Sequence, residues 1–584
     1  MSSRLTCLLT AVFAVALPVA GASAAPLGFG APVKVDDQLA GGEPVTITDL
    51  VHHTLVYSSH EGTTHLYRPG FASASTLTFA AGYRNQVNMW LSKDDGKTFK
   101  RVDYLGGTPV DPSKNTGFSD PDFTQDAGGR IYNTGIDLAN QSLFSSNDGG
   151  ATWDKGTPQC APGDRPWLAG GKKDEVFLST DSLVGTVNHQ VFQSTDGGNT
   201  CSVAGIKAEG TTDKGESWLG TGKLFYDRAS DNLFEPSQIQ ANGSTVGVGI
   251  DVWHRGDQQF TLRRVPVATT IYAHWPSVAQ DDGGTIYLAW DTNPTQTGTA
   301  GGCNGDPTPA ANKIMLAATH DFGKTWSAPI AVAAPSGHRV FWPWVVAGEA
   351  GRINVTWYET DNLADLACQK AKISVKTVTV TDADRFGAER MTNTADAVGR
   401  PIADNNICQS GTTCVATGED RRLGDFFTNG VGADGCAEIA SGDTSQKDPI
   451  TGGDLQTARP IFVKQTSGPR LRGSGDCSGA ADAGSDLGLP PATTPAGPGS
   501  AATCGSRRVF TIHLRAPHGV HLRSATITVA GHRIVAHRSA GRLVARVDLR
   551  GLARGRYTVA IRAVSTKGQV LRSSRRYRTC TPGH

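Results

Sequence analysis

Long apolar runs are scarce in this chain of 584 residues. After the first 24 residues, no stretch approaches the roughly 20 consecutive apolar residues that a membrane-spanning helix needs. The one marked apolar run, Leu8 to Ala20, follows Arg4 and precedes small residues at positions 22–24, a pattern typical of an export signal that is cleaved before Ala25. We therefore expect a secreted, extracellular protein without a transmembrane segment.

Metal-binding and thiol motifs are also missing. The sequence contains no C-x-x-C pair, no H-E-x-x-H and no EF-hand loop, which argues against structural zinc and a catalytic thiol. Cys7 lies in the export signal, and the other ten cysteines stand singly at 160, 201, 303, 368, 408, 414, 436, 477, 504 and 580. An even number outside the cell predicts disulfides, and we consider Cys303–Cys368 and Cys504–Cys580 as pairs. No cofactor is expected, and metal occupancy stays open, with Ca²⁺ as the ion considered.

Acidic residues are almost absent from the C-terminal part. Positions 505–584 hold seventeen Arg and Lys residues and one acid, Asp548, a formal net charge of +16 in a chain that is only +1 as a whole. Such a segment can bind an anionic cell-envelope polymer by charge. An arginine-rich composition spread over a solvated domain explains the charge equally well.

Composition divides the chain into an export signal (1–24), a main body (25–465), a linker (466–503) and a final domain (504–584). The linker is rich in Gly, Pro, Ala and Ser and lacks hydrophobic periodicity. Beyond it, alternating runs such as ATITVAGHRIVAH and RYTVAIRAV end in turns. These runs predict a small, basic, Ig-like β-sandwich.

The main body repeats. Each copy is a short apolar strand that starts near Pro, then a Gly/Asp turn, then a second strand that ends in an aromatic residue. The copies lie at 43–57, 120–132, 165–177, 275–290 and 342–358, with weaker ones at 223–234 and 423–440. Repeats of this kind are typical of propeller blades. The sequence therefore predicts an all-β fold, a β-propeller with seven blades, or with six if the last copy only closes the ring.

A second repeat, S/T-x-D-x-G-x-T, follows four of these units. Its aspartates are Asp94, Asp148, Asp196 and Asp321. A short carboxylate can accept backbone N–H groups in a tight turn, and Gly supplies the positive φ that such a turn requires. We therefore interpret these four Asp boxes as structural.

Asp boxes on blades that open with P-x-x-x-x-D-x-x-G-x-I-Y resemble the sialidase/BNR-repeat superfamily over residues 40–465. The resemblance implies a sialidase-like propeller that acts on glycans with an arginine triad, an Asp acid/base and a Tyr–Glu nucleophile pair. By this resemblance, Arg68 and Arg84 are candidate substrate-binding arginines, and Tyr358 and Glu359 have the residue types of the nucleophile pair. The segment after Arg84, NQVNMW, lacks the family's Asp, and adjacent strand residues such as Tyr358 and Glu359 point to opposite faces.

Strand direction gathers further candidates at one end of the ring. Because strands alternate within a blade, the starts of first strands and the loops after second strands lie opposite the Asp boxes, around the axis. The catalytic candidates there are Asp120, Asp122 and Asp164. The substrate-binding candidates are Arg165, Trp167, His274, Trp342, Arg421, Arg422 and Asp425, and Glu43, His60 and His65 share the rim. Carboxyl groups, guanidinium groups and flat rings are the side chains that a sugar site needs.

Two functions of different classes fit these features. The first is an exo-acting, sialidase-type glycoside hydrolase. The alternative is a non-catalytic propeller that binds glycans or a surface partner and is anchored to an anionic envelope by its basic C-terminal domain. In both cases we expect a glycan or glycoconjugate partner and a monomer.

Overall fold

The chain divides into two compact units, Met1–Asp482 and Ala483–His584. In the first unit, the computed structural model describes residues 25–61, 65, 67, 86–102, 119–137, 140–154, 157–181, 189–242, 244–267, 276–292, 312–363, 369–408, 419–448 and 451–478. In the second it describes residues 509–513, 522–529, 532–539, 542–548, 555–566 and 570–579. The export signal, the site candidates Arg68, Arg84 and His274, and the pairs Cys303–Cys368 and Cys504–Cys580 lie outside the described residues.

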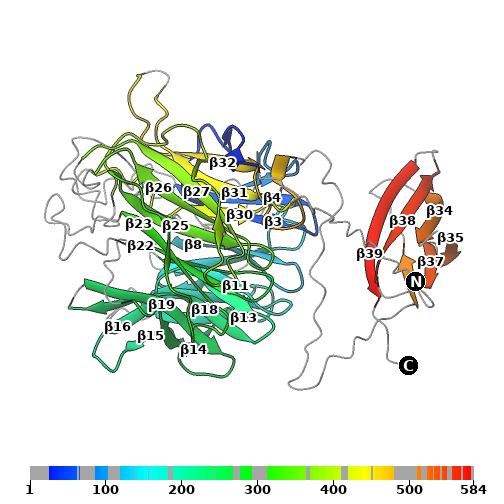
Figure 1. Cartoon of the computed structure of the whole chain (residues 1–584), viewed down its shortest axis with the longest axis horizontal. Coiled ribbons are helices and arrows are strands. Elements are labelled where there is room, and N and C mark those ends of the chain that lie inside the picture. Colours follow the sequence, from blue (N-terminus) through cyan, green and yellow to red (C-terminus); the bar gives the residue numbers. More distant parts are fainter. Residues whose placement is uncertain are drawn as a thin grey trace, which may run out of the picture. The chain divides into compact units, whose positions relative to one another are not determined.

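The described strands of the first unit form seven antiparallel sheets (Figure 1). The first sheet contains β3 (Gly42–Asp49), β4 (Thr54–Glu61), β5 (Gln86–Ser92) and β6 (Lys100–Arg101). The second contains β7 (Ser119–Gln125), β8 (Ile131–Asp137), β9 (Asn140–Ser146) and β10 (Thr157–Pro162). The third contains β11 (Asp164–Gly170), β12 (Val176–Asp181), β13 (His189–Ser194) and β14 (Ser202–Lys207). The fourth contains β15 (Glu209–Thr211), β16 (Ser217–Gly220), β17 (Phe225–Asp227), β18 (Asn232–Ala241), β19 (Ser244–His254) and β20 (Thr261–Arg264).

Three more sheets complete the set. The fifth contains β21 (Ser277–Gln280), β22 (Ile286–Thr292), β23 (Lys313–Thr319) and β24 (Ile330–Ala333). The sixth contains β25 (Val340–Ala347), β26 (Ile353–Thr360), β27 (Ile373–Thr381), β28 (Arg390–Met391) and β29 (Ala395–Asp396). The seventh contains β30 (Thr428–Val431), β31 (Ala437–Asp443) and β32 (Arg459–Ser467), and β32 also pairs with β1 (Gly28–Phe29) and β2 (Val33–Lys34) near the chain's start.

The seven sheets close into a ring. Neighbouring sheets contact one another in chain order, and β30 of the seventh sheet contacts both β25 of the sixth and β3 of the first. Apolar side chains fill the spaces between neighbouring sheets; Tyr57 and Trp90 of the first sheet, for example, share a buried cluster with Phe462 of the seventh. Burial on both faces explains why every residue of β26, INVTWYET, is buried. The first unit is therefore an all-β propeller, and no helix in the described residues is long and apolar enough to cross a membrane.

The four Asp boxes form turns with the same hydrogen bonds. In the second sheet, Asp148 accepts hydrogen bonds from the backbone N–H and the hydroxyl of Thr152, at 2.9 and 2.6 Å, and Gly150 N–H donates to Ser146 Oγ at 2.9 Å. The same contacts recur around Asp94, Asp196 and Asp321. Burial alone raises the pKa of Asp148, but these hydrogen bonds outweigh it and lower the pKa below its ordinary value.

The register places these turns opposite the starts of the inner strands. In the first sheet, Gly42 of β3 pairs with His60 of β4, whereas Leu55 at the other end of β4 pairs with Ser92, where the Asp box begins. The boxes and the inner-strand starts therefore lie at opposite ends of the sheets.

The second unit contains two antiparallel sheets. One orders β33 (Val509–His513), β37 (Arg542–Asp548) and β36 (His537–Ser539), and the other orders β35 (His532–Val535), β34 (Leu522–Val529), β38 (Gly555–Ser565) and β39 (Val570–Thr579). Ile527, Val547 and Val559 belong to one core that draws on both sheets. The described strands thus form a small two-sheet domain with a shared core.

The first unit reaches beyond residue 465, where the sequence suggested that the linker begins. Strand β32 ends at Ser467, and Cys477 forms a disulfide with Cys436 of the seventh sheet. The N–H groups of Leu471 and Arg472 donate to the carbonyl of Gly435, at 2.8 and 3.1 Å. The hydrophobic pattern of the sequence does not reveal this segment, because backbone hydrogen bonds and a disulfide hold it in place and no apolar stripe does. A second disulfide, Cys160–Cys201, joins the second and third sheets.

Candidate functional site

Four inner strands begin with the same local distortion. Their registers shift between Gly42 and Val45, Ser119 and Asp122, Asp164 and Trp167, and Phe341 and Trp344. Each bulge contains a non-glycine residue with positive φ directly before a proline: Glu43 (47°), Asp120 (52°), Arg165 (56°) and Trp342 (52°). Left-handed backbone is costly for such residues, and bulges of this kind re-aim a side chain. One strained position thus recurs in four sheets, at the end of the ring opposite the Asp boxes.

A pocket of about 460 Å³, part of it open to solvent, lies among these starts. Its lining combines charged, aromatic and small residues from several sheets: Asp120, Arg165, Trp167, Thr221, Gly222, Pro276, Trp342, Pro343, Trp344, Asp425 and Phe426.

Asp120 lies in an acidic neighbourhood. Its backbone N–H donates to Glu43 Oε2 at 3.1 Å, and its carboxyl group accepts a hydrogen bond from the Ser119 hydroxyl. Burial and the nearby charges of Glu43 and Asp164 raise the pKa of Asp120 well above its ordinary value. The carboxyl group can therefore hold a proton inside the pocket.

Asp425 lies in the opposite electrostatic setting. Arg421 donates two hydrogen bonds to it, from Nη1 to Oδ1 at 2.6 Å and from Nη2 to Oδ2 at 3.1 Å. Burial raises the pKa of Asp425, but the Arg421 guanidinium outweighs this effect and brings the pKa to about 2. Asp425 is therefore a carboxylate at neutral pH, and the pKa values of the two pocket acids are shifted in opposite directions.

Arg165 supplies the pocket's positive charge. Its neighbour Asp164 accepts a hydrogen bond from the Arg165 backbone N–H at 2.9 Å. Burial raises the pKa of Asp164, and the Arg165 charge opposes that shift. Asp164 itself lies beside the pocket and does not line it.

Aromatic rings form one wall. Trp167 packs against Trp344 and Phe426, with ring centroids 5.8 and 5.1 Å apart, and Trp344 stacks on Phe426 at 5.9 Å. Trp342 is only 2% exposed and also contacts the pocket. Flat rings of this kind offer an apolar surface to the face of a sugar.

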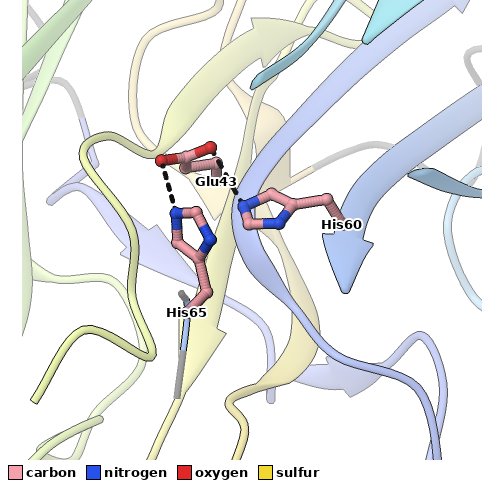
Figure 2. Close-up of side chains that lie close together, drawn as sticks. All are labelled: Glu43, His60 and His65. Atoms are coloured by element: carbon pink, nitrogen blue, oxygen red, sulfur yellow. Dashed lines mark hydrogen bonds and ion pairs between the residues drawn. The ribbon is translucent and has the colours of Figure 1, made fainter. Parts of the chain in front are cut away.

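A buried cluster lies behind Asp120 and Asp425. Glu43 Oε2 is 3.0 Å from His60 Nε2, and Glu43 Oε1 is 3.2 Å from His65 Nε2 (Figure 2). Oε1 also accepts the backbone N–H of Asp425 at 3.0 Å. Burial raises the pKa of Glu43, but the two imidazoles outweigh it and lower the pKa well below its ordinary value. One buried carboxylate therefore contacts residues of the first, second and seventh sheets.

Several sequence candidates lie away from the pocket lining. Asp122 accepts the Leu168 N–H at 2.7 Å and Lys223 Nζ at 2.6 Å, so it connects neighbouring sheets. Arg422 is buried, and its guanidinium bonds the carboxylate of Asp420. The guanidinium also lies over the ring of Tyr67, with Cζ 5.0 Å from the ring centroid.

Tyr358 and Glu359 diverge, as their adjacent positions on β26 require. The Tyr358 hydroxyl bonds Ser441 Oγ at 2.9 Å, and its ring stacks on Phe427 with centroids 4.0 Å apart. Glu359 contacts His338 and the indole N–H of Trp357, at 3.0 and 3.1 Å. The two side chains form no pair, and neither lines the pocket.

The pocket also contains residues that the sequence reasoning did not select. Trp344 lies two positions after Trp342, and Phe426 directly follows Asp425. Thr221 and Gly222 come from the fourth sheet, whose inner strand is divided into β16 and β17 and carries no X-Pro start. The W-P-W triplet at 342–344 was the available signal for Trp344, because it places two aromatic residues at the start of one inner strand.

Comparisons with known proteins give similarity to solved structures only, since no family model and no curated protein matches the chain. A protein of unknown function from Dyadobacter fermentans is 12% identical, with a TM-score of 0.38 over 75% of this chain and 99% of that one. The NanB sialidase of Streptococcus pneumoniae is 11% identical, with a TM-score of 0.37 over 75% and 70%. An alpha-L-arabinofuranosidase from Fusarium graminearum is 11% identical, with a TM-score of 0.33 over 76% and 98%. At these values the similarity assigns no activity, and the propeller fold rests on the chain's own ring of sheets.

Proposed function

We propose that this chain is a glycan-active propeller whose axial pocket holds one sugar residue and whose paired carboxyl groups hydrolyse the glycosidic bond. Asp120 and Asp425 support this most directly, because they come from distant parts of the sequence and line one pocket. Two carboxyl groups flanking the scissile bond are the usual machinery of glycoside hydrolysis. The aromatic wall and Arg165 supply the stacking surface and the guanidinium group that sugar recognition uses.

The two acids take different roles in this mechanism. Asp120 donates its proton to the glycosidic oxygen, so that the leaving group departs as an alcohol. The Asp425 carboxylate, held by Arg421, stabilises the positive charge that develops at the anomeric carbon. Water supplies the hydroxyl group at that carbon, and its second proton returns to Asp120.

Turnover of a glycoside panel by the full chain tests the proposal. The panel contains a sialoside, a uronide, a sulfated sugar and neutral hexosides with fluorogenic leaving groups. We expect hydrolysis of at least one, and a loss of about 10²- to 10⁴-fold in Asp120→Asn, the usual contribution of a general acid. Asp227→Asn is the matched control, because among the described residues the Asp227 carboxylate accepts hydrogen bonds from Ala229 and Ser230 in a turn and does not line the pocket. Undiminished turnover in Asp120→Asn contradicts the assignment.

The Arg421–Asp425 pair favours a second candidate, glycan binding without turnover. Both oxygens of Asp425 already accept hydrogen bonds from a buried guanidinium, which leaves that carboxylate little freedom to react. Saturable sugar binding that Trp167→Ala weakens, without hydrolysis of any panel member, supports this candidate over the enzyme.

For the second unit we propose contact with an anionic polymer. Arginines at 523, 533, 538, 546 and 562 are exposed on its strands. Charge-driven binding weakens as salt screens the interaction. We expect the full chain to bind an anionic polysaccharide at low ionic strength and to release it at high salt; salt-independent binding contradicts a charge-based contact.

A further inference from the structure

We propose that Glu43, His60 and His65 bind a single zinc-type transition-metal ion behind the pocket. Their donor atoms lie within 4.8 Å of one another (Figure 2). None of the three side chains lines the pocket, so the ion would lie outside the proposed sugar site, although Glu43 contacts the backbone N–H groups of Asp120 and Asp425.

The donor atoms are close enough for side-chain movements to bring them onto one ion, because one atom from each residue lies within 4.8 Å of the other two. The two nitrogen–oxygen separations are 3.0 and 3.2 Å, and the imidazole rings lie edge to face with centroids 4.0 Å apart. Ligands on a tetrahedral zinc ion, with bonds of about 2.0 Å, lie about 3.3 Å apart. Side-chain rotations that bring one Glu43 oxygen and one nitrogen of each imidazole to this spacing therefore complete the ligand set.

The ligand chemistry selects the metal. Two imidazoles and one carboxylate form a ligand set that zinc accepts, with a fourth position left for another ligand. Calcium and magnesium prefer oxygen ligands, so the two histidines select against them.

Burial separates this cluster from an ordinary surface ion pair. Glu43 and His60 are 0% exposed and His65 is 3% exposed. Nδ1 of His65 is buried without a hydrogen-bond partner among the residues that the structure describes. A buried polar atom without a partner is destabilising. A buried carboxylate and two imidazoles, one of which has an unpaired nitrogen among the described residues, thus form an incompletely satisfied polar cluster.

Local structure preorganises the three side chains. Glu43 and His60 lie at the paired ends of β3 and β4, and His65 follows five residues after His60. A Cβ at Gly42 would lie 2.9 Å from the Arg422 carbonyl and 3.4 Å from His60 Nε2, so the close approach requires glycine. The N–H groups of Asp120 and Asp425 hold the Glu43 carboxylate from behind, as outer partners commonly hold metal ligands.

Metal content of the full chain tests the inference. Protein dialysed against a chelator is equilibrated with zinc chloride, freed of excess ion and analysed by mass spectrometry for bound metal. We expect one zinc per chain, raised thermal stability and no competition by calcium. His60→Gln and His65→Gln keep an N–H donor for Glu43 but lose the imidazole, so we expect each to weaken zinc binding by about 100-fold or more.

A histidine–aspartate pair outside the cluster provides the control. His52 Nδ1 lies 2.6 Å from Asp49 Oδ2, without a second imidazole among the described residues, so His52→Gln should keep the zinc. If a cluster variant fails to fold, the wild-type chain is loaded with cobalt instead. The visible absorption of the bound cobalt, and the loss of that absorption when zinc is added, then report the same site. A wild-type chain that retains no zinc and shows no cobalt spectrum overturns the inference, as does equal zinc retention by folded His60→Gln and His65→Gln. Either result leaves Glu43 as a hydrogen-bonded connector only.

Discussion

Arg421 and Asp425 form a two-pronged ion pair, with Nη1–Oδ1 and Nη2–Oδ2 distances of 2.6 and 3.1 Å, in which the Arg421 side chain is only 4% exposed. Removing the carboxylate leaves a buried guanidinium without its main counter-charge. We therefore expect Asp425→Asn to lower the free energy of unfolding by about 3 to 5 kcal/mol. Chemical denaturation measures the loss. Asp382→Asn is the control, because its partners Arg385 and Arg390 have side chains that are 72% and 82% exposed, and such exposed pairs contribute at most about 1 kcal/mol each. Equal losses in the two variants would show that the pocket pair is not specially stabilising.

Arg165 should discriminate between acidic and neutral sugars. It lines the pocket, and a hydrogen bond to a charged group is worth about 1.5 to 3 kcal/mol. Arg165→Ala is expected to weaken the binding of an acidic sugar by that amount and the binding of a neutral sugar by less. Calorimetry measures both binding free energies. The exposed Arg385→Ala should change neither. Equal losses of binding affinity for both sugars would show that Arg165 does not bind the acidic group.

The Asp boxes predict a pH-dependent contribution to stability. Hydrogen bonds lower the folded-state pKa of Asp148, so its contribution is complete above the unfolded-state pKa of about 3.9 and is lost as the pH falls through the lower folded-state value. At pH 7, Asp148→Asn should destabilise the protein by about 1 to 3 kcal/mol. The difference from wild type should shrink below about pH 4. A difference that is constant with pH, measured by thermal unfolding, would mean that the charge of Asp148 is not involved.

Tyr358 should be structural and not a nucleophile. Its hydroxyl bonds Ser441 and its ring stacks on Phe427, away from the pocket. Tyr358→Phe is expected to cost about 0.5 to 1.5 kcal/mol of stability, the net value of one hydrogen bond, and to leave sugar turnover and binding unchanged. Loss of turnover in the folded variant would instead indicate that Tyr358 acts as a sialidase-type nucleophile.

The repeats predicted the propeller because each unit exposes an apolar face that only a neighbouring unit can cover. The same reasoning explains why the rim is only partly predictable. Strand direction gathers Asp120, Arg165, Trp342 and Asp425 near the axis, but it does not say which side chains neutralise one another.

Arg421 and Arg422 show this limit well. They are adjacent in sequence, and we selected both as sugar ligands, whereas the structure pairs each with its own carboxylate, Asp425 and Asp420. Both carboxylates lie within four residues of their arginines, in the segment before β30. The absence of a sequence motif is a related limit: no H-E-x-x-H is present, yet pairing of β3 with β4 brings Glu43 close to His60, and His65 lies in the same cluster.

A crystal structure with bound sugar tests the central claim most directly. Crystals of the full chain are soaked with the best panel sugar, or with its released product. We predict ligand density in the axial pocket, with the sugar face on the Trp167 wall, an acidic group at Arg165 and the anomeric carbon between Asp120 and Asp425. Density at another surface, with the axial pocket empty at a saturating concentration of a sugar that the protein binds in solution, would contradict the assignment of this pocket as the glycan site.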